Sequence, residues 1–174
     1  MLKFVAEMHK RLYRLDEVVA AVAASRTIIP RPNVSIGSLL YDSRKITDRE
    51  HGLFFALEGR RDGHTYIPDA YAKGVRNFVV ADDRINPAVF PDANFIVVAS
   101  PLAAMQQLAA FHRSQFSYPV IAITGSNGKT IVKEWLFQLL APEYRIIRSP
   151  KSYNSQLGVA LSLWEMDDAY NLAI

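Results

Sequence analysis

The feature that most constrains the fold is a glycine-rich turn between an apolar segment and an amphipathic one. Residues 120–123 read Val-Ile-Ala-Ile, which is typical of a short buried strand. Residues 124–130 read Thr-Gly-Ser-Asn-Gly-Lys-Thr, and a helical pattern follows to about Leu140. The alternation continues with a predicted strand at 144–148, a helix at 157–164 and the start of a strand at 171–174. Such alternation predicts a parallel sheet covered by helices.

The turn has the composition of a phosphate-binding loop. Glycines let the backbone point successive N–H groups at one anion, and the dipole of the following helix favours negative charge there. We therefore expect Lys129 to reach the β and γ phosphates of ATP, and the Thr130 hydroxyl to bind Mg²⁺. The residues expected to contact the nucleotide are Gly125, Ser126, Asn127, Gly128, Lys129 and Thr130. The general pattern has an earlier glycine where this chain has Ile123, so an ordinary glycine-rich turn is the alternative.

The first part of the chain mixes helices and strands. Helices are predicted at 15–24, at 68–73 and from 101 to about 113, and strands at 39–41, 53–57, 77–80 and 94–98. Gly74 suits a left-handed helix end, and Ser100 before Pro101 suits a helix start. Residues 114–119 are interpreted as a linker. The predicted fold class is α/β, with a small mixed α/β domain at 1–117 followed by the first part of a P-loop parallel-sheet ATPase domain at 118–174.

Composition excludes several classes of protein. The chain has no cysteine, so disulfides and thiolate metal sites are excluded. The net charge of +3 is spread along the chain, which gives little reason to expect a nucleic-acid partner. The early apolar run 18–24 follows Asp16 and Glu17 and is far shorter than the roughly 20 residues of a membrane helix, so we expect no signal peptide, no membrane partner and a cytoplasmic location.

Several other conspicuous residues receive structural interpretations. The histidines, at positions 9, 51, 64 and 112, lack ligand spacing, so no metal site is expected on them. Trp135 and Trp164 have apolar neighbours at helical positions and are predicted to be core residues. Arg60 and Arg61 suit a diphosphate by chemistry, although solvation is the more ordinary role for such side chains.

The same residues resemble the Mur ligases, ATP-dependent enzymes that build the peptide stem of bacterial cell-wall precursors. The loop of that family reads Thr-Gly-x-x-Gly-Lys-Thr after an apolar strand, and it also lacks the early glycine. The N-terminal domain of the MurE and MurF types is similar to Asp42-Ser43-Arg44, Gly52–Gly59, Asp62-Gly63-His64, Ala70 and Gly74-Val75. Residues 153–159, Tyr-Asn-Ser-Gln-Leu-Gly-Val, resemble the MurF type better than the MurE type. The chain is therefore identified as resembling the MurF type over residues 15–174.

The resemblance implies a reaction and its binding residues. A full-length MurF-type ligase uses ATP to phosphorylate the carboxylate of UDP-N-acetylmuramoyl-tripeptide, and the amine of D-alanyl-D-alanine then attacks the acyl phosphate. The N-terminal domain holds the uridine diphosphate end, which makes Ser43 and Arg44 candidate contacts; an Asp42–Arg44 ion pair that only shapes a turn is an equal alternative. Asn154 alone keeps a side-chain amide of the MurF pattern Asn-x-Asn-Asn, so it is a candidate substrate-binding residue.

Three alternatives in function accompany this interpretation. They are a MurE-type ligase, a folylpolyglutamate-like ligase and a non-catalytic P-loop nucleotide-binding module. Residues 118–174 are fewer than the roughly 100–150 of a typical domain. We therefore expect an N-terminal fragment that is inactive by itself, with a partly exposed sheet after Tyr118 through which copies self-associate.

Overall fold

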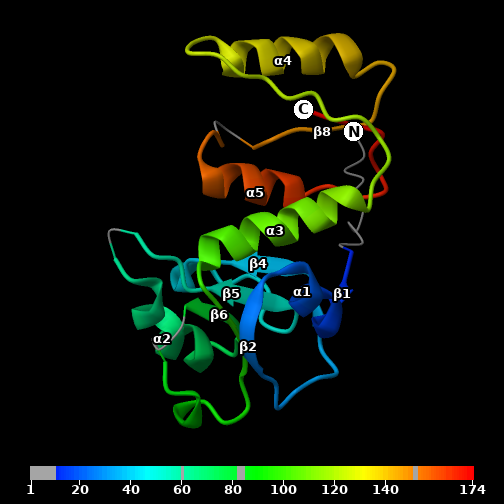
Figure 1. Cartoon of the computed structure of the whole chain (residues 1–174). Helices are drawn as coiled ribbons and strands as arrows, with labels where there is room; N and C mark the ends of the chain where they lie inside the picture. Colours follow the sequence, from blue (N-terminus) through cyan, green and yellow to red (C-terminus); the bar gives the residue numbers. More distant parts are fainter. Residues whose placement is uncertain (1–10, 60, 82–84, 151–152) are drawn as a thin grey trace.

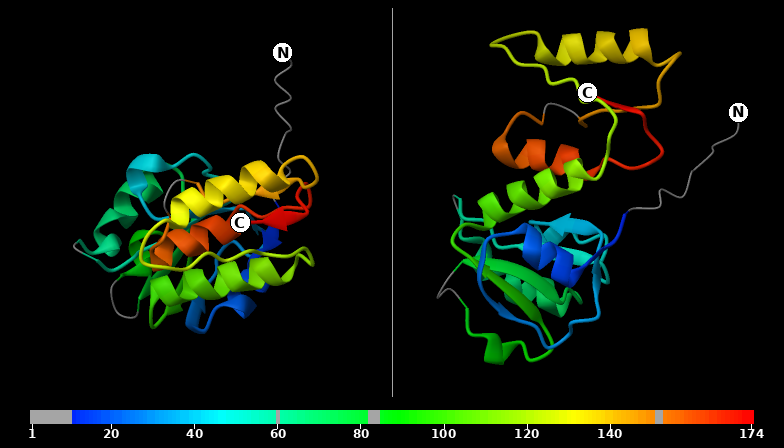
Figure 2. Two further views of the ribbon diagram at one scale, coloured as in Figure 1. Left: turned by 90° about the horizontal axis from the view of Figure 1, so that it is seen from above. Right: turned by 45° about the vertical axis from the view of Figure 1, so that its right-hand side comes forward.

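The computed structural model describes residues 11–59, 61–81, 85–150 and 153–174 as a stack of layers. A helix lies at one end, followed by a short sheet, two packed helices, a five-stranded sheet and a last helix (Figures 1 and 2). In that order the helices are α4 (Lys129–Leu140), α5 (Gln156–Trp164) with α3 (Pro101–Ser114), and α2 (Ile67–Ala72). The chain is therefore an α/β protein, and α3 packs on α5 between the five-stranded sheet and the short sheet beside α4.

The larger sheet is mainly parallel. Its strand order is β2-β7-β6-β5-β4, and every neighbouring pair is parallel except β2 with β7. The strands are β2 (Ala24–Ile28), β4 (Ser38–Leu40), β5 (Gly52–Phe55), β6 (Asn77–Ala81) and β7 (Asn94–Val98). The four predicted strands of this region are confirmed, and β2 is an addition that the sequence analysis missed.

Both faces of this sheet are buried. Phe54, Phe78 and Phe95 point to the face that α2 covers. Their neighbours along the strands, Phe55 and Val79, point to the opposite face, which α3 and α1 (Leu15–Ala21) cover. Because alternate residues bury on opposite faces, the strands read as continuous apolar runs. Short elements complete this part: β1 (Tyr13–Arg14), β3 (Ser35–Ile36) and the 3₁₀ turns η1 (Ser43–Lys45), η2 (Gly63–Tyr66) and η3 (Pro87–Val89).

The helix boundaries follow local chemistry. The Ser100 hydroxyl accepts a hydrogen bond from the Ala103 N–H at 3.3 Å and so caps α3, as predicted. Gly74 has φ of +99° just after α2, which confirms the expected left-handed position. The predicted helix 15–24 is wrong at its end, because α1 stops at Ala21 and the following residues pair with the edge of β7 instead.

The smaller sheet joins β8 (Ile146–Ile147) in parallel to β9 (Leu172–Ala173). Val120 forms a parallel bridge with Ala173, and the Ile121 N–H donates to the Ala173 oxygen at 2.9 Å. The predicted strand 120–123 is wrong beyond this point, because the register sets Val120 beside Ala173 and leaves the later residues past β9. The predicted β-α-β-α-β order is otherwise present, in shortened form.

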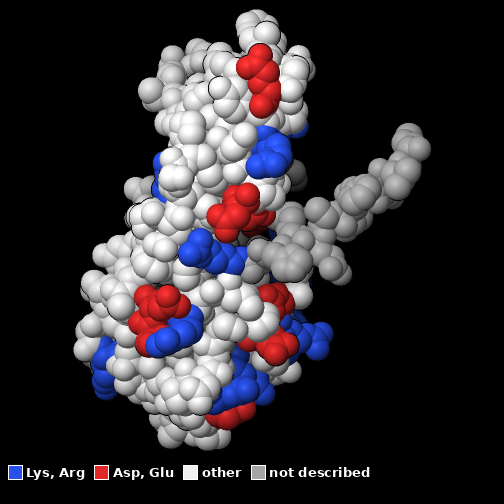
Figure 3. All heavy atoms as spheres, turned by 90° about the vertical axis from the view of Figure 1, so that its right-hand side faces the viewer, with Lys and Arg blue, Asp and Glu red and all other residues white. Residues whose placement is uncertain are grey.

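Helix α4 covers only part of this smaller sheet. Trp135 on α4 is 63% exposed and Leu139 is 73% exposed, whereas Trp164 on α5 is 4% exposed. The core prediction is therefore confirmed for Trp164 and wrong for Trp135, because most of the Trp135 side chain is exposed to solvent. None of the helices in the described part of the chain combines the length and apolar character needed to cross a bilayer. Basic and acidic side chains are interspersed on the face that Figure 3 shows.

Candidate phosphate-loop site

The glycine-rich turn has the backbone geometry of a tight loop leading into a helix. Gly125 has φ of +146° and Gly128 has φ of +78°, both values that L side chains rarely adopt. Gly128 directly precedes α4, and Lys129 is the first helical residue. The Lys129 Nζ donates to the Gly125 oxygen at 2.5 Å and to the Ser126 oxygen at 3.5 Å. The loop thus curls around the lysine ammonium at the positive end of a twelve-residue helix.

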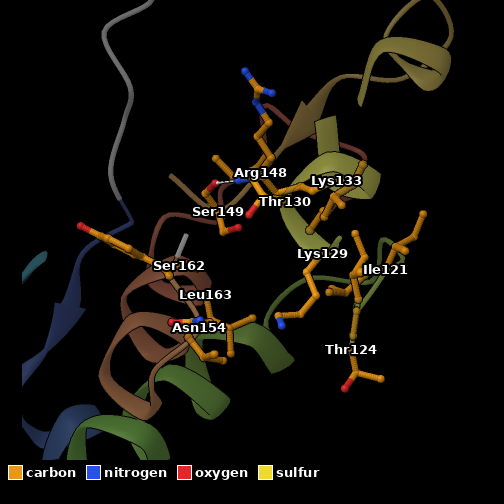
Figure 4. A pocket seen from close by; sticks show the side chains of 18 of the residues that line it. Ile121, Thr124, Lys129, Thr130, Lys133, Arg148, Ser149, Asn154, Ser162 and Leu163 are labelled. Carbon is orange, nitrogen blue, oxygen red and sulfur yellow. Dashed lines mark hydrogen bonds between the residues drawn. The ribbon is translucent and has the colours of Figure 1, made fainter. Parts of the chain in front are cut away.

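A cavity of about 590 Å³ opens beside this loop. Its walls come from α4, α5, the segment 120–125, and β8 and β9 with the residues that follow them (Figure 4). Gly125, Lys129 and Thr130 line it, whereas Ser126, Asn127 and Gly128 do not. This volume lies within the roughly 300–1,000 Å³ of small-molecule sites. Half of the predicted loop residues therefore line one solvent-open cavity whose volume lies in the range of small-molecule sites.

Asn154 lines the same cavity from the opposite side (Figure 4). The hydroxyl of the next residue, Ser155, accepts a hydrogen bond from the Gly158 N–H at 3.0 Å and begins α5. A side chain at position 158 would crowd Tyr153, since an added Cβ would lie 3.0 Å from the Tyr153 Cβ. The sequence Tyr153–Gly158 thus fixes Asn154 just before the start of α5. The fold brings Asn154 to the same cavity as the phosphate loop.

Lys133 is a cavity residue that the sequence analysis missed. It is only 7% exposed, and its Nζ donates to the Ser149 oxygen at 2.8 Å. Lys133 lies one helical turn after Lys129, so both lysines share one face of α4. The four-residue spacing from Lys129 is the sequence feature that could have identified Lys133 as a cavity residue. The cavity therefore has two ammonium groups on the α4 side.

Ser43 and Arg44 do not line the cavity. The Arg44 Nε and Nη2 each donate to the Asp42 carboxylate at 2.9 Å, and these bonds hold the pKa of Asp42 down at about 2. The Ser43 side chain is buried, and its carbonyl oxygen accepts from the Lys73 Nζ at 2.9 Å. The ion pair of the structural alternative is therefore present, while the Arg44 side chain remains 82% exposed.

The residue before this turn, Tyr41, interacts electrostatically with Tyr153, which lines the cavity. Burial raises the pKa of the Tyr41 hydroxyl, and the nearby phenol of Tyr153 raises it further. Tyr41 directly precedes Asp42, and Tyr153 directly precedes Asn154. Each candidate substrate-binding segment thus begins one residue after a partly exposed tyrosine, and these two phenols influence each other electrostatically. Of the two arginines considered for a diphosphate, Arg61 donates to the Tyr66 hydroxyl at 3.4 Å, and Arg60 lies outside the described residues.

The described histidines serve as hydrogen-bonding residues. The His64 Nδ1 lies 2.5 Å from the Asp62 carboxylate, while its Nε2 accepts from the Ala81 N–H at 2.9 Å. His9 lies outside the described residues. Across the part of the chain that the structure describes, no group of three or more His, Cys, Asp or Glu is placed to hold a metal ion.

Comparison with known proteins identifies the family. No protein-family model matches the chain. The UDP-N-acetylmuramoyl-tripeptide–D-alanyl-D-alanine ligase of Treponema pallidum is 34% identical over 161 residues, which are 88% of this chain and 35% of that protein. The crystal structure of MurF from Acinetobacter baumannii superposes with a TM-score of 0.82 at 29% identity, over 94% of this chain and 35% of that one. This chain is a homologue of the MurF ligases.

Two further relatives extend this assignment. The corresponding ligase of Bacillus subtilis is 34% identical over 134 residues, which are 76% of this chain and 28% of that protein. The MurF ligase from Thermotoga maritima, solved in complex with ADP, matches with a TM-score of 0.68 at 27% identity, over 78% of this chain and 30% of that one. This MurF homologue therefore spans about a third of the length of the relatives it matches. The resemblance drawn from the sequence motifs is confirmed.

Proposed function

We propose that this MurF homologue supplies the uridine-nucleotide-binding region and the ATP phosphate loop of a peptide ligase. The ligase would add D-alanyl-D-alanine to UDP-N-acetylmuramoyl-tripeptide in peptidoglycan precursor synthesis, in the cytoplasm. The observation that carries the proposal is the cavity of about 590 Å³ that Lys129, Thr130 and Asn154 share. Homology to ligases named for this reaction supports the substrates.

The residues of the loop fit a nucleoside triphosphate. Positive-φ glycines at 125 and 128 keep side chains away from the concave face of the turn. The Lys129 ammonium would exchange its bonds to the Gly125 and Ser126 oxygens for bonds to phosphate oxygens. Thr130 would offer its hydroxyl to the Mg²⁺ that accompanies ATP. The homologous Thermotoga maritima structure, solved in complex with ADP, supports the binding of an adenine nucleotide.

The proposed chemistry needs charge stabilisation more than proton transfer. ATP would supply a phosphoryl group to the tripeptide carboxylate, and the dipeptide amine would displace phosphate from the resulting acyl phosphate. Lys129 and the amide groups at the start of α4 would hold the negative charge on the transferred group. Asn154, across the cavity, would orient the substrate end that reacts.

We place the functional boundary of the chain near Ser117. Residues 1–117 would hold the uridine diphosphate end of the substrate through Ser43 and Arg44, and residues 118–174 would begin the ATPase domain. Arg44 supports this role because its guanidinium is 82% exposed while Asp42 fixes its orientation. We also propose that copies of the chain associate through the partly exposed sheet after Tyr118.

Calorimetry with ADP and Mg²⁺ tests the nucleotide site. We expect Lys129→Ala to weaken ADP binding by at least about tenfold, since a charge-assisted bond to phosphate is lost. The control is Arg26→Ala, which removes one exposed positive charge from β2, outside the cavity lining. Equal affinities of the Lys129→Ala variant and the unmodified chain would refute the proposed site.

A nucleotide panel tests the ligase type. We expect thermal stabilisation by UDP as well as by ADP, whereas a folylpolyglutamate-like ligase or a simple P-loop module would respond to ADP alone. A response to UDP would leave the MurE type to be separated by activity. Phosphate release from ATP that requires both UDP-N-acetylmuramoyl-tripeptide and D-alanyl-D-alanine, measured on the full ligase, would confirm the reaction.

A further inference from the structure

Lys133 is buried, whereas most lysine side chains extend into solvent. Its side chain is 8% exposed, although a lysine ammonium is costly to bury unless it is paired. The Nζ donates to the Ser149 oxygen at 2.8 Å and lies 3.6 Å from the Glu134 Oε1. Ser149 follows β8, so the bond crosses from α4 to the strand next to β9. The lysine thus joins two walls of the cavity (Figure 4).

Neighbouring residues reinforce the same junction. Glu134 is paired with the Arg148 guanidinium, and that guanidinium lies 3.9 Å from the centre of the Phe137 ring. Lys133, Glu134 and Phe137 all belong to α4, whereas Arg148 and Ser149 both follow β8. The Ser149 N–H also donates to the Ile174 oxygen at 3.0 Å. The residue that Lys133 holds is therefore anchored on its other side to the end of β9.

The held segment leads to the far wall of the cavity. From Ser149 the chain continues to Tyr153 and Asn154, and both of these residues line the space opposite Lys129. We infer that Lys133 is a positioning residue, whose ammonium fixes the start of the β8–α5 connection against α4 and so sets the spacing between Asn154 and the phosphate loop. The inference rests on the proposed nucleotide site for its functional consequence.

The alternative is that Lys133 merely adds stability to the fold. If Lys133 only stabilised the fold, its replacement would lower the free energy of global unfolding and would speed hydrogen exchange at amides throughout the chain. A positioning role would act on the Ser149 amide and on ligand affinity, while the five-stranded sheet would stay unchanged. Since Lys133 acts through a charged donor, arginine at this position should restore both properties.

The test combines amide exchange by NMR with calorimetry of ADP and Mg²⁺ on the whole chain. In Lys133→Met we expect the Ser149 amide to exchange about tenfold faster, with the β7 amides unchanged and ADP affinity lower by about tenfold. Lys133→Arg should restore both values. Gln138→Met, an exposed substitution on the same helix, is the matched control.

Separate outcomes distinguish this inference from the nucleotide site itself. Lys129→Ala should weaken ADP binding without changing exchange at Ser149, because the Lys129 bonds stay within its own loop. If the unmodified chain bound no ADP, the proposed function would fail, and Ser149 exchange would still test the contact. Unchanged Ser149 exchange in Lys133→Met, or in Lys133→Gln where the methionine variant unfolds, would overturn the inference.

Discussion

The Nε2–H of His112 on α3 donates a hydrogen bond of 2.9 Å to the carbonyl oxygen of Met166, which follows α5. A carbonyl can only accept, so the hydrogen lies on Nε2, and Nδ1 accepts from the Tyr13 hydroxyl at 2.7 Å. The His112 ring also lies 4.6 Å from the Trp164 ring. One neutral, buried histidine therefore links β1, α3 and the end of α5, the last of which carries a wall of the candidate site.

The buried His112 predicts acid sensitivity of the fold. Burial lowers the pKa of His112 to about 4 and outweighs the Met166 hydrogen bond and the nearby Asp167 and Asp168 carboxylates, which raise it; the Arg11 charge also lowers it. In the unfolded chain the pKa is about 6.5, so between these values only the unfolded state takes up the proton. Stability should be full above pH 6.5 and fall by on the order of 3 kcal/mol as the pH drops to 4. Urea denaturation at several pH values measures this.

A substitution isolates the contribution of this histidine. His112→Gln should show a lower free energy of unfolding at pH 7 and a flatter pH dependence between 6.5 and 4. The Asp42 carboxyl does not interfere in that window, because its pKa is held at about 2 and its contribution is lost only at lower pH. Parallel pH profiles for the two proteins would contradict the assignment.

Substitution of the two tryptophans should reduce the free energy of unfolding by very different amounts. Trp164 packs in the core shared by α3 and the large sheet, and its Nε1–H donates to the Gly37 oxygen at 3.1 Å. We expect Trp164→Ala to reduce the free energy of unfolding by about 3–5 kcal/mol. Trp135→Ala should stay within about 0.5 kcal/mol, since that side chain is 63% exposed. Urea denaturation of both variants provides the comparison, and equal losses would contradict the described position of α5.

The left-handed glycine before α4 predicts a purely conformational penalty. A Cβ at Gly128 would meet no atom within 4 Å, so Gly128→Ala is disfavoured only by its φ of +78°. We expect a loss of about 1 kcal/mol in stability together with weaker ADP binding, because the loop must change shape. Gly59→Ala is the matched control, since that site is equally open and has no positive φ. Thermal unfolding by circular dichroism and calorimetry measure the two effects, and normal ADP affinity in Gly128→Ala would argue against the loop geometry.

Substitution of Arg44 tests whether this residue contacts a ligand or only shapes the turn through its ion pair with Asp42. If the guanidinium binds diphosphate, Arg44→Ala should abolish the thermal stabilisation by UDP while changing unfolding in buffer only slightly, because exposed ion pairs contribute little. Arg44→Lys should recover UDP binding only in part, since lysine lacks the planar fork. Arg26→Ala should leave the UDP response intact. An unchanged response in Arg44→Ala would assign the residue to the turn alone.

Much of the larger sheet was predictable because its signals are local. The strand β7 was predicted with its observed limits, 94–98, from one continuous apolar run. Ser100 with Pro101 and Gly74 mark helix ends through hydrogen bonds and dihedral angles that involve only near neighbours. The strand β2 was missed because residues 24–28 carry no alternating pattern, and they become a strand through pairing with β7.

The candidate site also combines features that the local sequence predicts with features that depend on tertiary contacts. The sequence by itself determined a glycine-rich turn followed by a helix that ends at Leu140, because turn and helix chemistry act over a few residues. Only the tertiary structure decided that Asn154 and Lys133 face one cavity, that Trp135 is exposed while Trp164 is buried, and that pairing of the 120–123 segment stops near Val120. These outcomes depend on which distant surface lies opposite each residue, and local periodicity carries no information about that partner.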